Sequence, residues 1–358
     1  MPIIDKTFES NKYTAVYLVE EEHDGMRLDQ YLQTYLASWS REQVKKKISQ
    51  GDITIKDRPG KHRASTKIYT RDIITLITHK TEHEDEYWNG ELLELQTEPE
   101  ILFEDEDLII ISKPPYMSTH PTGKHLFNCA TVFFESMYKK TCHSIHRLDR
   151  ETSGALMLAK NPKCAQIMTE GFEKDLVRKC YFFIAYNRDW NNEYSFEDNH
   201  RLGASEEGLK RVYINHFPKD STDGKSARTL FEVVHVEGDY VLGLAFPITG
   251  RQHQIRVHAM INGLPLVGDK LYLGNFKMFQ RFKDNIATKE DHDLMEISRH
   301  ALHAIALRAP YKGEEKIFSS TIPNDLQKWI KSKMTIDLGD LQEKLESKIQ
   351  DYFNKDKR

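Results

Sequence analysis

The sequence has few of the features that mark secreted, membrane-bound or zinc-binding proteins. It contains only four cysteines, without closely spaced pairs, and no cluster of Cys and His at zinc-finger or HExxH spacing. No apolar run approaches the roughly 20 residues that a membrane-spanning helix needs. The first residues lack the charged and then apolar layout of a signal peptide. We therefore expect a cytoplasmic protein with reduced cysteines, no metal ion and no membrane association.

Charge is distributed unevenly along the 358 residues, although the net charge is only -4. Residues 41–71 contain ten Lys or Arg and three Asp or Glu, whereas residues 81–107 contain twelve Asp or Glu and no Lys or Arg. The basic block favours contact with nucleic acid, and the acidic run is typical of a solvated spacer without chemistry of its own. A chain of this length is expected to form two or more domains.

Two short helices are predicted near the N-terminus, after a strand at residues 13–20. In the first helix, apolar residues recur at helical spacing at Leu28, Tyr31, Leu32, Tyr35 and Leu36. Ser40 is the predicted N-cap of the second helix, with Gln43 at the capping-box position and Gly51 at its end. A strand at residues 72–78 closes this part of the chain.

Basic side chains continue from the second helix into the following turn and strand, with few counter-charges. They are Arg41, Lys45, Lys46, Lys47, Lys56, Arg58, Lys61, Arg63 and Lys67. A lone run of three lysines is usually just a solvated helix face, but a basic surface that spans helix and loop suits a phosphate backbone. The segments 27–32, 40–44 and 51–55 resemble the S4 RNA-binding domain, and this resemblance implies that the basic residues bind RNA.

The larger C-terminal part alternates strands and helices. Strands are predicted at residues 101–103, 108–113, 155–159, 177–185, 229–234, 240–247 and from 302, and helices at 129–140, from 162 and from 251. A charged insertion extends to about residue 298. A closing amphipathic helix at 339–353 carries one apolar stripe, which we attribute to packing, at Leu341, Leu345, Ile349 and Phe353.

Residues 146–160 change from a charged loop to an apolar strand near Gly154. Asp149 is therefore expected on a loop at the edge of a sheet, with Arg147 and Arg150 on either side. Taken alone, this pattern is more often a surface charge cluster, which contributes little energy, than a catalytic group. Motifs elsewhere in the chain have to decide between the two interpretations.

Five motifs occur in an order typical of one enzyme family. They are residues 146–154, Lys179-x-Tyr181, residues 250–258, Gly268-Asp269-x-x-Tyr272 and residues 302–304. Together they resemble the RluA-type pseudouridine synthases, over about residues 100–325. The sequence departs from that family at Gln252, where Thr or Ser is usual, and mildly at Lys270-Leu271. Neither departure affects the acid that the family uses or its basic partner.

The resemblance implies an isomerase that converts uridine in RNA to pseudouridine, with Asp149 as the catalytic carboxylate. It implies that Arg256 keeps Asp149 ionised and oriented, and that Tyr181 stacks on the uracil or helps to remove its C5 proton. Whether Asp149 attacks the ribose, attacks the base or removes the 2′ proton is left open by the sequence. Because nothing is oxidised and no group enters or leaves, no cofactor is expected.

Further residues in these motifs are expected to contact RNA or to support the loops. The expected RNA contacts are Arg147, Arg150, Lys179 and Arg251. Arg147 would fill the space that a flipped-out uridine leaves, or would bind a phosphate. The remaining group consists of histidines, which we interpret as packing or loop-fixing residues, at positions His146, His253, His258 and His303.

Two other classes of function are compatible with parts of the sequence. A non-catalytic RNA-binding protein would use the same surfaces, but it would be expected to lack one of Asp149, Arg256 and Tyr181, and all three are present. A glycoside hydrolase also cleaves at an anomeric carbon but needs two carboxylates. Glu151 is the only nearby second carboxylate, and it is poorly placed on the same loop.

The predicted fold is α+β, in four parts along the chain. They are an S4-like domain with an N-terminal strand (1–80), an acidic linker (81–99), a pseudouridine synthase domain with a mixed, mainly antiparallel central sheet flanked by helices and loops (100–335), and a C-terminal amphipathic helix (336–358). The S4-like domain favours large-subunit ribosomal RNA as the partner, with transfer RNA as the alternative. We expect a monomer without an obligate protein partner.

Overall fold

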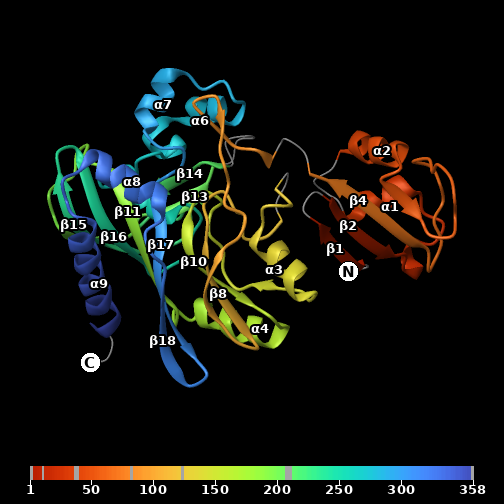
Figure 1. Ribbon diagram of the computed structural model, residues 1–358, viewed down its shortest axis with the longest axis horizontal. Helices are drawn as coiled ribbons and strands as arrows, with labels where there is room; N and C mark the ends of the chain where they lie inside the picture. The colour runs from red at the N-terminus through yellow and green to blue at the C-terminus, as the bar shows by residue number, and fades with distance from the viewer. Residues whose placement is uncertain are drawn as a thin grey trace. The chain divides into compact units, whose positions relative to one another are not determined.

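A computed structural model of the chain describes residues 3–9, 12–35, 40–80, 84–121, 125–205 and 212–355 (Figure 1). The predicted helical position Leu36 and residues 81–83 of the predicted linker lie outside these ranges. The chain divides into two compact units. The small unit comprises Met1–Asp85 with His120–Thr141, and the large unit comprises Glu86–Thr119 with Cys142–Arg358.

The small unit contains an antiparallel four-stranded sheet in the order β1-β2-β4-β3. Its elements are β1 (Ile3–Glu9), β2 (Lys12–Leu18), the short 3₁₀ helix η1 (Glu21–His23), α1 (Leu28–Tyr35), α2 (Arg41–Gln50), β3 (Ile53–Ile55), β4 (Ile73–His79) and α3 (Ala130–Tyr138). The apolar positions of α1 and α2 pack on the sheet in one core, which includes Leu28, Leu32, Val44, Ile48, Ala15, Ile74 and Leu76.

The ends of α2 are set by local sequence, as predicted. The Ser40 side chain accepts the backbone N–H of Gln43 at 3.2 Å, and the Gln43 side chain accepts the backbone N–H of Ser40 at 2.7 Å. This reciprocal capping box satisfies two N–H groups that have no partner within the helix. At the other end Gly51 has a φ of 84°, a left-handed conformation that glycine adopts without strain.

Helix α3 belongs to the small unit, although the predicted boundaries put residues 120–141 in the synthase domain. A buried carboxylate from a segment far away in the sequence supports the start of this region. Glu84 accepts the backbone N–H groups of Leu126 and Phe127 at 3.2 and 3.1 Å. The small unit is therefore built from two separate stretches of sequence, and this pairing cannot be read from local patterns.

The large unit is built on a ten-stranded sheet with the order β12-β15-β16-β11-β17-β10-β8-β7, in which β18 also pairs with β17 and β9 with β10. All of these pairs are antiparallel except β10 with β17. The predicted mixed, mainly antiparallel sheet is therefore confirmed. Two short hairpins, β5–β6 and β13–β14, lie outside this sheet.

The strands of the large unit are β5 (Tyr87–Trp88), β6 (Glu91–Leu92), β7 (Glu100–Glu104), β8 (Leu108–Lys113), β9 (His143–Ser144), β10 (Ser153–Ala159), β11 (Arg178–Tyr186), β12 (Ser195–Asp198), β13 (Arg201–Ala204), β14 (Ile214–Phe217), β15 (Thr229–Glu237), β16 (Tyr240–Pro247), β17 (Leu302–Tyr311) and β18 (Glu314–Ser319). Its helices are α4 (Pro162–Glu173), α5 (Gln254–Ile261), the π-helical turn η4 (Lys270–Gly274), α6 (Phe276–Lys283), α7 (Lys289–Met295), α8 (Asn324–Lys333) and α9 (Leu338–Asn354).

Helices α8 and α9 cover one face of the sheet (Figure 1). The apolar stripe of α9 is buried in that core, as predicted from its spacing, and α9 is part of the large unit. Side chains alternate between the two faces of a strand. On β11 the residues Cys180, Phe182 and Ile184 enter this core. Tyr181 therefore points to the opposite face.

The predicted acidic linker is not a plain solvated spacer. Within the large unit Trp88 on β5 stacks on Phe282 with ring centroids 5.9 Å apart, and it meets the edge of His292 at 4.4 Å. Glu86 forms an ion pair with Arg150 at 2.7 Å. The prediction of a solvated spacer was wrong for these residues, because an acidic run gives no sign of partners that are distant in sequence.

Two other predictions need correction in the large unit. Helix α5 begins at Gln254 and not at Arg251, because His253 has a left-handed φ of 54° that ends the preceding loop. The charged insertion before residue 298 contains the helices α6 and α7. Strands β1, β5, β6, β9, β12, β13, β14 and β18 and helix α8 were not predicted.

Among the described residues, no helix combines the length and the apolar character that a membrane crossing requires. The four cysteines are buried and none forms a disulfide.

The junction between the charged loop and β10 depends on a glycine. Gly154 has a φ of 108° and lies opposite Ala304 where β10 runs parallel to β17. A Cβ atom at this position would lie 2.2 Å from the carbonyl oxygen of Ala304. Only glycine fits this close approach. It thereby fixes the loop that carries Asp149 against β17.

Replacing Gly154 with alanine is expected to reduce the free energy of unfolding by about 1–3 kcal/mol more than replacing Gly313 does, because of this clash. Gly313 is a matched control: its φ is 84°, but nothing lies within 4 Å of an added Cβ. Urea denaturation followed by circular dichroism measures both variants. Equal destabilisation by the two substitutions would contradict the close approach of β10 and β17.

Candidate active site

A cavity of about 470 Å³ lies in the large unit on the Tyr181 side of the sheet. It is lined by the loop before β10, by the start of β11 and by the loop that leads into α5. The lining residues used below are Arg147, Asp149, Lys179, Tyr181, Arg251, His253 and Arg256. The three predicted catalytic residues therefore come together in one cavity, from segments up to about a hundred positions apart in the sequence.

Asp149 sits on a loop whose backbone is fixed on both sides. Thr119 accepts the backbone N–H of Leu148 and donates its hydroxyl to the carbonyl oxygen of Leu148, both at 3.2 Å. The backbone N–H of Thr152 donates to the carbonyl oxygen of Asp149 at 3.0 Å. The side chain of Asp149 remains 27% exposed. The carboxylate is thus held firmly at its base and open toward the cavity.

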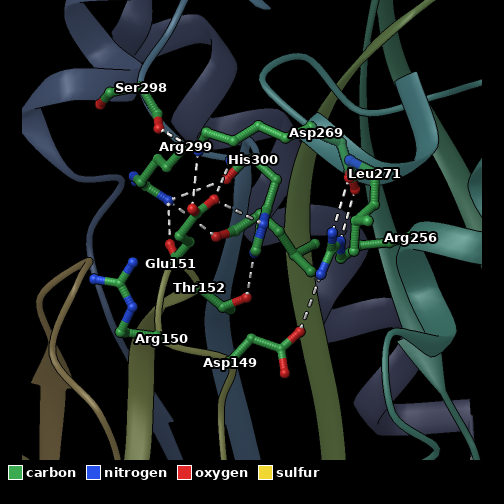
Figure 2. Close-up of polar contacts among 12 residues, drawn as sticks. Asp149, Arg150, Glu151, Thr152, Arg256, Asp269, Leu271, Ser298, Arg299 and His300 are labelled. Carbon is green, nitrogen blue, oxygen red and sulfur yellow. Dashed lines mark hydrogen bonds and ion pairs between the residues drawn. The ribbon is translucent and has the colours of Figure 1, made fainter. Parts of the chain in front are cut away.

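Arg256 on α5 faces Asp149, with Nη1 at 3.5 Å from Oδ2 (Figure 2). Its other two nitrogens are bound to Asp269: Nε lies 2.6 Å from Oδ2 and Nη2 lies 2.8 Å from Oδ1. Asp269 is fully buried and also accepts the backbone N–H groups of Leu271 and Tyr272. Asp269 therefore fixes the guanidinium so that one nitrogen faces Asp149.

These contacts set the charge of Asp149. Burial alone would raise the pKa of its carboxyl, but the neighbouring His253 and Arg256 outweigh burial and hold the pKa below 3.8. His253 itself has its pKa lowered to about 3, chiefly by burial, so it is neutral at pH 7. Arg256, with a smaller contribution from Arg147, is therefore the cation that keeps Asp149 ionised.

Asp269 and Arg256 stabilise each other's charged forms. Burial opposes ionisation of both, but the contact with Arg256 lowers the pKa of Asp269 to about 2, and Asp269 raises the pKa of Arg256. A fully ionised pair at the floor of the cavity follows from these contacts.

Tyr181 is 9% exposed and lines the cavity. Burial, and then the negative charge of Asp149, raise the pKa of its phenol. The side chain is therefore a neutral aromatic ring with an intact hydroxyl at physiological pH.

The sequence profile of one family, described as RNA pseudouridylate synthase, matches residues 107–260. This range contains the loop with Asp149, strand β11 with Tyr181 and most of α5 with Arg256.

Residues 107–260 of the chain are therefore similar to RNA pseudouridylate synthases.

Similar proteins support RNA pseudouridine synthase activity. The ribosomal large subunit pseudouridine synthase C of Rickettsia prowazekii is 29% identical over 255 residues, which are 69% of this chain and 82% of that protein. The mitochondrial tRNA pseudouridine(32) synthase of Saccharomyces cerevisiae is 27% identical over 81% of this chain and 63% of its own length. The solved structure of human RNA pseudouridylate synthase domain containing 4 has a TM-score of 0.50 at 22% identity, over 65% of this chain and 92% of that one, and shows the shared fold.

Three of the four residues predicted to bind RNA in the synthase region line the cavity, and the fourth does not. Arg147 and Arg251 are exposed at its surface. Lys179 donates from Nζ to the carbonyl oxygen of Thr249 at 3.3 Å, and burial lowers the pKa of its ammonium to about 8. Arg150 instead binds Glu86 and points away from Asp149 (Figure 2).

The basic residues predicted to bind RNA in the small unit fall into two groups. The first group is exposed and forms no ion pair within the described ranges of the chain: Lys45, Lys46, Lys56, Lys61, Arg63 and Lys67. The other three are partly occupied by carboxylates: Arg41 lies 3.4 Å from Asp29, Lys47 lies 2.7 Å from Asp52 and Arg58 lies 2.8 Å from Asp72. The first group is the more available for phosphates.

Glu151 cannot serve as the second carboxylate of a glycoside hydrolase. It binds Lys270 at 2.9 Å and His300 at 3.3 Å, and these contacts outweigh burial and hold its pKa well below the usual range. The back of the loop that carries Asp149 is further held by Arg299, which donates to the carbonyl oxygen of Glu151, and by His300, whose Nε2 lies 2.8 Å from the Thr152 hydroxyl (Figure 2).

Three of the four motif histidines fix loops or pack, as predicted. His146 accepts the backbone N–H of Met157 at 3.0 Å, His258 contacts the Thr229 hydroxyl and His303 contacts the Ser153 hydroxyl. His253 differs, because its Nε2 lies 3.8 Å from Oδ2 of Asp149.

Sequence reasoning missed two residues of the site, Asp269 and His253. Both lie inside motifs that were recognised, but their partners are visible only in three dimensions. Within the described part of the chain, metal-ligating atoms gather only at Glu20, Glu22 and His23, in the small unit and outside this cavity.

Changing Asp269 to Asn is expected to cost about 3–5 kcal/mol of stability, because it leaves the buried guanidinium of Arg256 unpaired. The double variant Asp269→Asn with Arg256→Gln removes both buried charges and should recover most of this loss. Thermal and urea denaturation measure the stability of wild type, of Asp269→Asn and of the double variant. The exposed pair Lys289–Asp293 is the control, and its replacement by alanines should cost about 0.5 kcal/mol or less.

The stability of wild type and that of the double variant are also expected to depend differently on pH. Because the folded-state pKa of Asp269 is lowered from 3.8 to about 2, its contribution to stability is present above pH 4 and is lost as the pH falls toward 2. Wild type should therefore lose more stability than the double variant over this window. Parallel pH dependence in the two proteins would contradict the assigned pair.

Proposed function

We propose that this synthase isomerises uridines with Asp149 as its catalytic carboxylate, and that its substrate is large-subunit ribosomal RNA. The observation that supports the first part is an ionised carboxylate at an open cavity, 3.5 Å from an arginine that a second carboxylate holds in place. No other carboxylate on the catalytic loop has this freedom, since Glu151 is bound to Lys270 and His300.

The isomerisation of uridine requires one ionised carboxylate. The N1–C1′ bond of the uridine breaks, the uracil turns and a C5–C1′ bond forms, while C5 loses a proton and N1 gains one. Atoms and electrons balance within the nucleotide, so no cofactor is needed. An ionised carboxylate suits attack on C1′, attack on the base or removal of the 2′ proton, and the geometry around Asp149 is compatible with all three.

Arg256 and Tyr181 have supporting roles in this proposal. Arg256 keeps Asp149 ionised and aims it, at a distance that leaves the carboxylate free to react. Tyr181 offers a neutral aromatic ring beside Asp149, which suits stacking on the uracil or help with the C5 proton. The target uridine has to leave its stack to reach this cavity, and exposed Arg147 at the rim is suited to fill the space it vacates.

The small unit is proposed to act as an S4-like RNA clamp. Its exposed Lys45, Lys46, Lys61 and Arg63 suit the phosphate backbone, which gives affinity and orientation without sequence recognition. This module favours ribosomal RNA over transfer RNA. The relatives do not decide between the two, because their names include synthases for each.

In cells that lack the gene, specific pseudouridines in large-subunit ribosomal RNA are expected to disappear, and wild type but not Asp149→Asn should restore them. The amide has nearly the same shape as the carboxylate but carries no charge and is a poor nucleophile. Asp293→Asn, at an exposed position of α7, is the control and should restore the sites fully. Carbodiimide adducts mapped by primer extension locate the pseudouridines.

The outcomes of this experiment test the proposed reaction and the proposed RNA substrate separately. Loss of transfer RNA sites alone would retain the reaction and refute the choice of ribosomal RNA. Full restoration by Asp149→Asn would refute the role of Asp149. No change at any site would favour an RNA-binding protein without catalysis.

Replacing Lys45, Lys46, Lys61 and Arg63 by alanine is expected to weaken RNA binding and to make it less dependent on salt. Each lost phosphate contact should reduce the slope of log Kd against log salt concentration by about 0.7–0.9. Alanine at exposed Lys328 and Lys331 on α8 is the matched control and should leave the slope unchanged. Equal slopes for both variants would refute the proposed clamp.

A further inference from the structure

His253 carries an unusual combination of backbone and side-chain contacts at the cavity. It is the residue before α5 and has a left-handed φ of 54°, a conformation that residues other than glycine adopt infrequently. Nonglycine residues in such conformations are retained where surrounding contacts hold them, and they cluster at functional sites. The contacts on both sides of this imidazole indicate what it does.

On one side, His253 contacts a hydroxyl that can donate its hydrogen to the ring. Nδ1 lies 2.9 Å from the hydroxyl oxygen of Tyr272. The same oxygen accepts the backbone N–H of Ile214 at 3.0 Å. Because a backbone N–H can only donate, the single hydrogen of the hydroxyl is available for Nδ1. Nδ1 is then the acceptor, and a neutral imidazole carries its own hydrogen on Nε2.

On the other side, that Nε2–H faces the catalytic carboxylate. Nε2 of His253 lies 3.8 Å from Oδ2 of Asp149, and Nη1 of Arg256 lies 3.5 Å from the same oxygen. Two N–H groups, one from His253 and one from Arg256, therefore face the same carboxylate oxygen of Asp149.

We propose that His253 is a positioning residue, fixed by Tyr272 as the neutral Nε2–H tautomer, which orients Asp149 together with Arg256. This inference rests on the proposed role of Asp149. The 3.8 Å separation is longer than a hydrogen bond, and such contacts in free enzymes shorten when the substrate closes the site. The left-handed backbone at His253 is what directs its ring between Tyr272 and Asp149.

The neutral state of the imidazole fits its surroundings. Burial is the main cause that lowers the pKa of His253 to about 3, and Arg256 adds to it. The titratable or charged groups around the ring are Asp149, Arg256, Asp269, Tyr272 and His300. The two carboxylates oppose the lowering, but burial and the positive charge of Arg256 outweigh them. A fixed neutral donor keeps the same tautomer across the physiological pH range.

The first test observes the tautomer directly, without RNA. Full-length protein is labelled with 15N-histidine, and the His253 signals are assigned by their absence from the spectrum of His253→Gln. Between pH 6 and 8 we expect a protonated Nε2 and an unprotonated Nδ1 in wild type, and loss of this preference in Tyr272→Phe. A protonated Nδ1 in wild type, or an unchanged tautomer in Tyr272→Phe, would overturn the inference.

The second test uses two amides that separate backbone from side-chain roles. Glutamine places an N–H at the position of Nε2 but is strained at a φ of 54°. Asparagine tolerates this φ but reaches only the position of Nδ1. If His253 orients Asp149, His253→Gln should isomerise faster than His253→Asn, with about a 10- to 100-fold difference in single-turnover rate at saturating RNA and a similar RNA affinity. If His253 only completes the turn, His253→Asn should be the faster and more stable variant.

Total RNA from cells lacking the gene is the substrate, and thermal denaturation checks that each variant folds. Equal rates for the two amides, or a faster His253→Asn, would overturn the inference while wild-type activity leaves the proposed function intact. An inactive wild type would instead refute the proposed function, and the tautomer measurement would still decide whether His253 is fixed as described.

Discussion

The buried ion pair between Arg256 and Asp269 is the interaction on which the rest of the site depends. A guanidinium that is only 7% exposed is costly to bury unless its charge is neutralised and its N–H groups are satisfied. Asp269 does both, and two backbone N–H groups in turn hold Asp269. Because two nitrogens of Arg256 are thus occupied, only the third faces Asp149. Asp149 is ionised by its neighbour without being held in a two-bond salt bridge.

A second set of contacts holds the loop of Asp149 from behind. Glu151 binds Lys270 and His300, and Arg299 donates to three backbone carbonyl oxygens around the same point, including that of Glu151 (Figure 2). Gly154 brings the end of the loop against β17. The two carboxylates of this short loop therefore lie in different surroundings. Glu151 is bound by Lys270 and His300, while Asp149 remains open to the cavity. Rigid support and a free reactive group are what positioned catalysis requires.

Much of this arrangement follows from local sequence. The capping residues Ser40 and Gly51 define α2, because caps act within a few residues, and strands β8 and β16 have the predicted bounds. The loop position of Asp149 follows from the change of pattern at Gly154. Ordered motifs resembling a known family then identified Arg256 and Tyr181, which spacing alone would not have done.

What the sequence did not reveal depends on partners that are distant along the chain. Arg150 was expected to contact RNA, but Glu86, 64 positions earlier, binds it. The start of α5 was misjudged because His253 adopts its left-handed turn against Tyr272, nineteen positions later. The acidic run hid a hairpin whose Trp88 packs on Phe282. In each case the deciding contact joins residues that are distant in sequence, so no local pattern of charge or hydrophobicity could predict it.

The most direct test of the central claim is the pH dependence of single-turnover isomerisation by wild type and by the Arg256→Gln, Asp269→Asn double variant. If Arg256 keeps Asp149 ionised, the rate for wild type should stay level down to pH 5, since the pKa of Asp149 lies below 3.8. The double variant should be slower, and its rate should begin to fall at a higher pH, because burial then raises the pKa of Asp149 unopposed by the guanidinium. If the rates of both proteins fall at the same acidic pH, this result would contradict the role of Arg256.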